Sequence, residues 1–374
     1  MSATEGMDAR PISAATRRAR QYTGTPEWFC EFTTTEVVGL GPEVGVHRRD
    51  PSSVLLVDGV FHTWYSRSTG ETVGFGSGDP GAKVFPWDLS EIWHATSTDG
   101  QVWVEQGRAV GAGAPGAYDD RSVFTPEVLE HEGRFHLVYQ VISSPYRLRS
   151  YESIAMATAS SPEGPWVKSP APLLEPSRTG EWLGDEDNRL AVLSQGDFDS
   201  LKVHDPILLP YDGRFFLYYK GEQKGEAYTM GGRSTRWGVA IAESVDGPYE
   251  RSPLNPVTNS GHETCLWLHD DGVAALLTTD GPERNTMQFA PDGLNFEITA
   301  YLPNPPIAAG PLRRRTPTTT PLDGVRWGLS HDVSGPWHFI TGFRADERMK
   351  DLYAAGISPE TAPAAGSWTS TPTD

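Results

Sequence analysis

Hydrophobic and polar positions alternate with a period of two in several short segments, and each of these segments follows a turn sequence. The clearest copies cover residues 57–65, 131–139 and 211–219, and a weaker copy covers residues 270–277. A turn of Asp-Gly or Glu-Gly followed by alternating aromatic residues is typical of a β-hairpin. We therefore predict a series of hairpins with related sequences.

A second unit follows each hairpin and consists of a strand of small residues, a turn, and an aromatic residue. Together the two units predict a four-stranded antiparallel sheet that recurs roughly every 60 to 80 residues. Radial repetition of such sheets gives an all-β fold, the five-bladed β-propeller. A β-sandwich is the alternative, but it does not require the same pair of units five times. The predicted blades cover residues 45–115, 116–178, 195–258, 259–302 and 303–345.

The two ends of the chain differ from this repeat. In residues 11–24, Ser13 can cap a short helix and Gly24 can end it. A single helix of this length is marginal in water, so it must pack on another surface. We divide the chain into an N-terminal helical segment (1–44), the propeller (45–350) and a flexible tail (351–374).

Net charge, cysteine content and the length of apolar runs limit the ligands, the structural sites and the location that we expect. The chain has 31 basic and 49 acidic residues, a net charge of −18, which argues against nucleic acid or an anionic membrane surface. Cys30 and Cys265 are too few for a disulfide framework or a structural zinc site, so we expect reduced, buried thiols. Without an apolar signal segment or a long apolar run, a cytoplasmic location is expected.

Ionisable residues stand near the start of the strand that precedes each hairpin. In a propeller this strand lines the central axis, where a buried acid is costly unless it is used or paired. Because strands of different blades meet only at the axis, we expect Asp50, Asp205, Glu263 and His262 to converge there. Carboxylates facing one another across a cleft are typical of glycosidases, which suggests acid–base chemistry on a sugar.

Histidines complicate this prediction. Adjacent strand residues point to opposite faces, so His262 can join Glu263 only at a strand end or a bulge. Either this imidazole or a carboxylate could then be the general acid. His47, His204 and His262 lie near three of the inner strands and could hold an ion or ordered water, although their spacing matches no local zinc motif. The acidic run 184–189 lacks EF-hand spacing and is predicted to be a polar loop between blades.

Several longer strings surround these residues, and we expect the substrate contacts to come from them. The strings are residues 45–52, 83–89, 118–127, 182–189, 202–206 and 258–263. The predicted contacts within these strings are His47, Arg48, Trp87, Arg121, Thr125 and His204, and Gln140, which lies outside them, is a further predicted contact.

At these strings the sequence resembles glycoside hydrolase family 117, the α-1,3-(3,6-anhydro)-L-galactosidases that split neoagarobiose. The resemblance runs from about Ser13 to beyond Leu312. It implies a five-bladed, exo-acting, inverting enzyme of agar degradation that releases 3,6-anhydro-L-galactose from non-reducing ends of neoagaro-oligosaccharides.

The resemblance also implies a role for each matching residue. Asp50 would be the general base, and Asp205 would stabilise the transition state and tune neighbouring pKa values. Glu263 would orient the sugar and support His262, the general acid. Ser13-x-Ala15-x-x-Arg18 matches a helical element that swaps between subunits, which implies a homodimer. No cofactor is required, although some family members carry a central divalent cation.

Two other functions stay open at the level of sequence. One is a related propeller hydrolase that acts on another sugar, such as an arabinofuranoside or a fructan. The other is a sugar-binding propeller without catalysis. The family itself contains groups without measured action on neoagarobiose, and this chain offers no histidine after His338 for a partner subunit.

Overall fold

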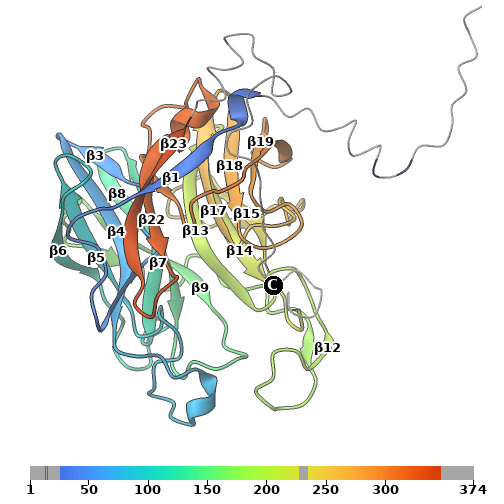
Figure 1. The fold of residues 1–374 in the computed structure, drawn as a ribbon. Coiled ribbons are helices and arrows are strands. Elements are labelled where there is room, and N and C mark those ends of the chain that lie inside the picture. The colour runs from blue at the N-terminus through green and yellow to red at the C-terminus, as the bar shows by residue number, and fades with distance from the viewer. Residues whose placement is uncertain (1–12, 14, 16–25, 227–234, 347–374) are drawn as a thin grey trace, which may run out of the picture.

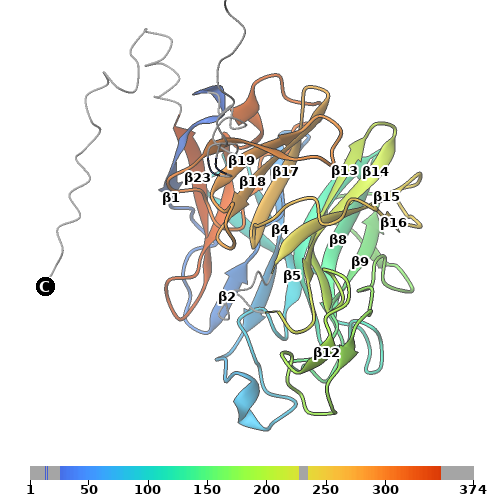
Figure 2. The same cartoon turned by 90° about the vertical axis from the view of Figure 1, so that its right-hand side faces the viewer.

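Five antiparallel sheets stand around a central axis, which confirms the predicted five-bladed β-propeller (Figures 1 and 2). The structure is a computed structural model and describes residues 26–226 and 235–346 together with Ser13 and Ala15. Apart from Ser13 and Ala15, the predicted helix at 11–24 lies outside the described residues, and so does the tail from residue 351. No helix of the described part is long and apolar enough to cross a membrane.

Blades one to three each begin with the strand nearest the axis and proceed outward in chain order. In blade one the inner strand is divided into two pieces, β2 and β3, which both pair with β4. The strands are β2 (Val46–Arg49), β3 (Leu55–Val57), β4 (Val60–Thr69), β5 (Glu91–Ser97) and β6 (Trp103–Val110); β7 (Ser122–His131), β8 (Arg134–Ile142), β9 (Ser153–Ala159) and β10 (Val167–Lys168); β13 (Lys202–Tyr211), β14 (Arg214–Glu222), β15 (Arg236–Ala242) and β16 (Glu250–Arg251).

Blades four and five complete the ring. Blade four repeats the same order, whereas blade five takes three strands from the C-terminal end of the propeller and its fourth, β1, from the N-terminal end. The strands are β17 (Glu263–His269), β18 (Gly272–Thr278), β19 (Thr286–Ala290) and β20 (Glu297–Tyr301); β21 (Gly310–Pro311), β22 (Trp327–Asp332), β23 (Phe339–Asp346) and β1 (Glu31–Thr35). Three short 3-10 helices are also described: η1 (Pro26–Trp28), η2 (Phe75–Ser77) and η4 (Pro321–Gly324).

Strand β1 closes the propeller. It pairs antiparallel with β23, from Glu31 opposite Asp346 to Thr35 opposite Gly342. Figure 1 shows this blue strand beside the red-orange strands β22 and β23. The propeller therefore starts at about residue 31, inside the segment 1–44 that the sequence pattern separated from it. No Asp-Gly turn precedes β1, so the repeat gives no signal there.

The hairpin turns have the backbone that their sequences predict. Asp58 and Gly59 have φ values of 49° and 83°. The pairs Glu132–Gly133 and Asp212–Gly213 repeat these positive values. Two positive φ angles in a two-residue loop define the turn whose twist matches paired strands, and Gly adopts them without steric cost. These turns fix the register between each inner strand and the next.

Apolar clusters fill the spaces between neighbouring blades. Trp64 and Tyr139 are fully buried in the cluster between blades one and two. Leu208 and Tyr219 occupy the next space, between blades two and three. Cys30 and Cys265 are buried together in the cluster between blades four and five, and both are free thiols, as predicted. Because these cores are closely packed, they hold the inner strands at fixed positions around the axis.

A small hairpin stands between blades two and three. It consists of β11 (Glu181–Trp182) and β12 (Val192–Ser194), which pair antiparallel, and the acidic run 184–189 forms the loop between them. In both ribbon views β12 and the light-blue segment that contains η2 project from the same end of the propeller (Figures 1 and 2). The acidic run is therefore an inter-blade loop, as the sequence indicates.

Candidate active site

The inner strands of blades one, two and three share one backbone irregularity. Asp50, Thr125 and Asp205 have φ values of 50°, 47° and 49°, and a proline follows each of them. The register of β7 and β13 shifts at this point, and in blade one the inner strand is interrupted here. A left-handed φ is uncommon outside glycine and strained for a β-branched threonine, and such strain concentrates at functional sites.

This irregularity brings the three side chains to the same cavity on the axis. The cavity has a volume of about 40 Å³ and is lined by Asp50, Thr125, Asp205 and Glu263, which come from four different blades. That volume holds a few water molecules rather than a sugar ring. The axial cavity is therefore the floor of a site at which carboxylates from distant parts of the chain meet.

Asp50 is surrounded by nitrogen atoms. Nδ1 of His331 lies 3.2 Å from its Oδ1 and 3.1 Å from its backbone nitrogen. Arg49 places a guanidinium nitrogen 3.5 Å from the same oxygen, and the Ser66 hydroxyl donates to Oδ2 over 3.4 Å. Burial by itself would raise the pKa of Asp50, but the charge of Arg49 and the contact with His331 hold it well below the ordinary value. Asp50 is therefore ionised at any ordinary working pH.

Asp205 has the opposite electrostatic character. Burial raises its pKa to about 6, although Lys220, whose ammonium group forms an ion pair with Oδ2, lowers it. The nearby charges of Glu263 and Asp50 raise the same pKa further. Lys220 is only 2% exposed, and the carboxylates around it raise its own pKa despite burial. One buried cation thus faces the carboxylates of the axis.

His262 and Glu263 lie at the start of β17. Gly261 has a φ of 102°, and Glu263 is the first residue of the strand, so His262 lies at the strand end that the sequence requires. Nε2 of His262 lies 3.7 Å from Oε1 of Glu263, and Nδ1 lies 3.8 Å from Oδ2 of Asp280. The imidazole is 45% exposed, which leaves it accessible to a ligand above the carboxylates. Burial alone would raise the pKa of Glu263, but Lys220 and His262 lower it.

Two of the predicted substrate contacts lie beside these groups. Thr125 lines the axial cavity. Trp87 stacks on Phe85 with 4.5 Å between ring centroids. The guanidinium of Arg49 lies 5.1 Å from the centroid of the Trp87 ring, so this tryptophan connects through Arg49 to Asp50. Trp87 is half-buried, and its ring is thus in contact with both Phe85 and Arg49 at the edge of the site.

Two predicted contacts have other partners. Arg48 binds Glu105 at 2.9 Å and Glu43 at 2.6 Å. Arg121 holds both oxygens of Asp88, at 2.8 and 2.7 Å. Each guanidinium is thus engaged by carboxylates within the protein, and a contact of either arginine with sugar stays a prediction.

The remaining three also have contacts within the protein, but Nε2 of His47 and Nε2 of His204 are buried and have no hydrogen-bond partner among the described residues. His47 packs against Trp337, with 4.9 Å between ring centroids. The amide of Gln140 donates to Glu152, and both side chains are buried. Nε2 of His204 lies 3.7 Å from a Glu222 oxygen. These residues surround the site and support it from beneath.

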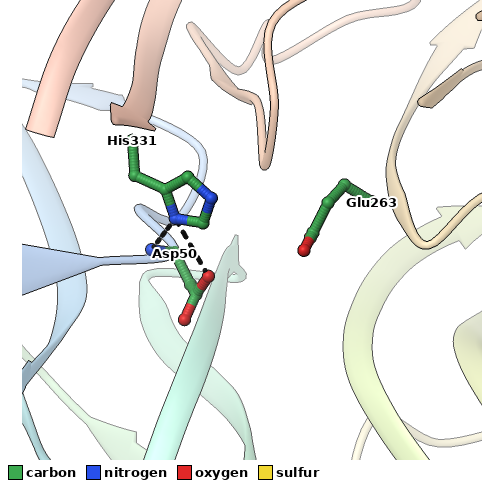
Figure 3. A group of neighbouring side chains, drawn as sticks. All are labelled: Asp50, Glu263 and His331. Carbon is green, nitrogen blue, oxygen red and sulfur yellow. Dashed lines mark hydrogen bonds and ion pairs between the residues drawn. The ribbon is translucent and has the colours of Figure 1, made fainter. Parts of the chain in front are cut away.

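The donor atoms that could hold a cation differ from the predicted histidine set. His47, His204 and His262 have separate surroundings. In the described part of the chain, Asp50, Glu263 and His331 are the side chains whose donor atoms come within 4.8 Å of one another. Figure 3 shows Asp50 bound to His331, with the Glu263 carboxylate directed toward them from the opposite side. Two carboxylates and an imidazole are a donor set that fits a divalent cation.

Sequence reasoning missed His331 and Lys220. Lys220 pairs with His204 in the neighbouring strand, as Gln140 pairs with Phe124 and Ser66 with Arg49. A polar residue thus follows the last aromatic residue of the second strand in each of these blades. This shared position in the sequence could have indicated polar side chains that face the axis. In blade five, His331 of β22 supplies the corresponding polar group.

Comparison with known proteins gives a consistent result. No family model and no curated protein matches the chain. Among solved structures, Zg3597, a family 117 glycoside hydrolase from the marine bacterium Zobellia galactanivorans, is 31% identical, with a TM-score of 0.71, over 89% of this chain and 99% of that one. A GH43_1 enzyme from Xanthomonas citri is 14% identical, with a TM-score of 0.50, over 87% of this chain and 92% of that one. A sucrose-6-phosphate hydrolase from Lactobacillus gasseri is 13% identical, with a TM-score of 0.53, over 90% of this chain and 64% of that one.

The fold and the axial carboxylates define a propeller glycoside hydrolase. The two more distant structures share the fold alone. The similarity to Zg3597 extends over nearly the whole of both chains at 31% identity. The chain belongs to glycoside hydrolase family 117.

Proposed function

We propose that the protein is an exo-acting, inverting hydrolase that releases 3,6-anhydro-L-galactose from the non-reducing end of neoagaro-oligosaccharides. The observation that carries this proposal is the meeting of Asp50, Asp205 and Glu263 on one axial cavity. The similarity of the motif strings to family 117 supports the choice of sugar.

The spacing of the carboxylates limits the roles that each of them can have. A donor atom of Asp50 lies within 4.8 Å of one of Glu263. The two carboxyl groups of an inverting pair are about 6.5–9.5 Å apart, because the attacking water must fit between them. Asp50 and Glu263 are too close for an inverting pair and are nearer to the separation of about 5–5.5 Å that is typical of a retaining pair. The proposal of inversion therefore rests on the resemblance to family 117, and it requires that Glu263 holds the sugar and does not act as the acid. The general acid must then be another group.

His262 is the group best placed to be that acid. Its two ring nitrogens each have a carboxylate oxygen within 4 Å, so an imidazolium would find an acceptor on both sides. Asp50 is held ionised by Arg49 and His331 and would accept a proton from water. Asp205, with Lys220 beside it, would stabilise the positive charge that develops on the sugar ring.

No cofactor is part of this proposal. Asp50, Glu263 and His331 would hold a divalent cation, which would supply positive charge at the axis. Since Asp50 is the proposed base, we expect catalysis to survive extensive dialysis against a chelator, with metal content checked by elemental analysis.

A pair of substitutions tests the two roles. Asp50→Asn removes the base, and we expect kcat to fall by about 10²–10⁴-fold on neoagarobiose and also on a nitrophenyl glycoside of the same sugar. His262→Gln should be as damaging on neoagarobiose but much less so on the nitrophenyl glycoside, whose leaving group needs no proton. Equal losses on both substrates for His262→Gln, or full activity in Asp50→Asn, would contradict the assignment.

The sugar itself is tested by a screen. Oligosaccharides from agar, carrageenan and arabinan should be compared, and proton NMR should identify the first-formed anomer. We expect release of 3,6-anhydro-L-galactose with inversion. Activity on arabinan alone would favour the second candidate, a propeller hydrolase of another sugar with the same site.

We also propose a homodimer formed through the N-terminal segment, on the basis of the motif Ser13-x-Ala15-x-x-Arg18. Deletion of residues 1–24 should give monomers in light scattering. A dimer that persists after the deletion would exclude the swap.

A further inference from the structure

A second cavity opens at the end of the propeller that is remote from the carboxylates. Its volume is about 430 Å³. It is lined by the last residues of the inner strands, among them Leu56, Leu129, Leu209 and Leu266, and by the segment after β21. The catalytic residues stand at the start of the same strands. All five blades therefore contribute to this distal cavity, as they do to the site at the other end.

An ion pair lies between the two cavities, which adjoin each other at Ser53 and Leu266. Arg313 contacts Glu127 at 2.7 Å and donates to the carbonyl oxygen of Leu208 at 3.0 Å. The other carboxylate oxygen of Glu127 accepts the backbone N–H of Ser53 at 2.9 Å. Glu127 lines the axial cavity, whereas Arg313 lines the distal one. A molecule in the distal cavity would thus meet this ion pair rather than Asp50, Asp205 or Glu263.

The rim of the distal cavity carries both acidic and basic side chains, since Glu130 and Glu132 line it together with three arginines. Arg313, Arg314 and Arg315 are consecutive in a chain whose net charge is −18. Arg313 is paired with Glu127, and Arg315 contacts Glu130 at 2.8 Å. Arg314 is exposed, and no carboxylate of the described residues pairs with it. Its guanidinium can therefore bind an anion without losing an existing partner.

The walls of the distal cavity combine leucines with polar residues such as Ser53, His131 and Thr318. Leu55, Leu129 and Leu266 are each no more than 5% exposed around it, whereas Leu56, at the rim, is 44% exposed and offers a larger apolar surface. Trp267 also lines the cavity but is only 7% exposed, so it offers little surface for stacking on a sugar. The volume lies in the range of small-molecule sites, about 300–1,000 Å³.

We propose that the distal cavity is a binding site for a small organic anion with an apolar body. The apolar body would pack against the leucines, and a carboxylate or sulfonate group would bind Arg314 beside Arg315. This site is independent of the proposed sugar chemistry, because the Glu127–Arg313 ion pair lies between the two.

The test is a fluorescence titration of the full-length protein with 8-anilinonaphthalene-1-sulfonate, which combines an apolar ring system with one sulfonate. We expect saturable binding of one molecule per chain, with a dissociation constant on the order of 10–100 µM. Decanoate should displace the probe, whereas decanol at the same concentration should displace far less.

Variants locate the binding. Arg314→Glu should weaken binding at least about tenfold, and Leu56→Asp should do the same through the apolar contact. Arg284→Glu is the matched control, since Arg284 is an exposed arginine outside the cavity and should bind like the parent. Asp50→Asn should also bind like the parent. Circular dichroism should show that each variant is folded.

Each outcome decides the proposal. Saturable binding that is lost in Arg314→Glu and Leu56→Asp, but kept in Arg284→Glu and Asp50→Asn, supports it. Absence of saturable binding, equal binding in all variants, or loss in Asp50→Asn would overturn it. Loss in Asp50→Asn would place the probe in the catalytic site instead.

Discussion

The two aspartates at the axis differ in the direction in which their surroundings shift the carboxyl pKa. Asp50 and Asp205 have similar backbone geometry, but Arg49 and His331 keep the first ionised, while burial brings the pKa of the second to about 6. Lys220 is the buried cation that opposes this rise. Carboxylates in one cavity can thus have different protonation behaviour because their nearest neighbours differ.

Lys220→Met should move the acidic limb of the pH–rate profile. Its charge lowers the pKa of Asp205, so its removal raises that pKa and keeps Asp205 protonated to higher pH. Because the proposal requires Asp205 to be ionised, activity on the acidic side should fall at a pH higher by roughly one unit. The measurement is kcat/KM as a function of pH, with circular dichroism to confirm folding.

Two further variants separate electrostatics from damage to the fold. Lys220→Arg keeps the charge and should keep the position of the limb even if the rate is reduced. Lys202→Met removes another lysine of low exposure, one that pairs with Glu152, and should leave the limb in place. An unshifted limb in Lys220→Met would show that the lysine does not set the protonation of Asp205.

At the scale of elements, Arg149 makes the most hydrogen bonds to the β11–β12 hairpin, which Lys224 and Glu222 of blade three also contact. A two-stranded hairpin by itself is marginally stable in water. The guanidinium of Arg149 donates to the carbonyl oxygens of Leu183, Gly184 and Asn188, among others, at 2.7–3.2 Å, and it lies 4.4 Å from the Trp182 ring centroid. Contacts with blade two thus hold this hairpin in place.

Arg149→Ala should loosen the hairpin without unfolding the propeller. We expect a protease that cuts after acidic residues to cleave within 185–187 at least about tenfold faster, because the loss of these hydrogen bonds makes local opening more frequent. Mass spectrometry of timed digests gives the rate and the position. Arg147→Ala, at an exposed arginine of the same turn, is the control and should be cleaved like the parent. Equal cleavage of both variants would show that Arg149 does not hold the β11–β12 hairpin in place.

At the scale of the whole molecule, stability depends on closure of the ring. Blade five joins β1 to β23, so the first and last described strands share one sheet. Phe32 of β1 is 5% exposed and packs on Phe343, with 5.8 Å between ring centroids. Blade five packs against blade four on one side and against blade one on the other. Separation of β1 from β23 therefore exposes two inter-blade cores.

Phe32→Ala should therefore destabilise the entire propeller. Removal of a buried phenylalanine side chain costs about 3–5 kcal/mol. We expect one cooperative transition at a lower temperature in differential scanning calorimetry. Thr33→Ala, at an exposed position of the same strand, should change stability little. Two separate transitions in Phe32→Ala would mean that blade five melts independently of the others.

Much of the architecture was predictable because it is local and repeated. The Asp-Gly turns and alternating aromatic strands recur often enough to give both the fold and the blade order. Strand β1 was missed because it lacks a turn of this type, and its partner β23 lies about 300 residues away in the chain. The carboxylate partners of Arg48 and Arg121 could not be predicted, because a sequence does not show which carboxylates reach an arginine in the fold.

The sequence by itself determined the repeat, the turns and the acids that stand at the start of the inner strands, since these depend on neighbouring residues. Tertiary structure alone decided the partners of those acids. Lys220 reaches Asp205 across a strand pair, and His331 reaches Asp50 because the ring closes and brings blade five beside blade one. Such contacts depend on distances through space, and only the closed propeller sets those distances.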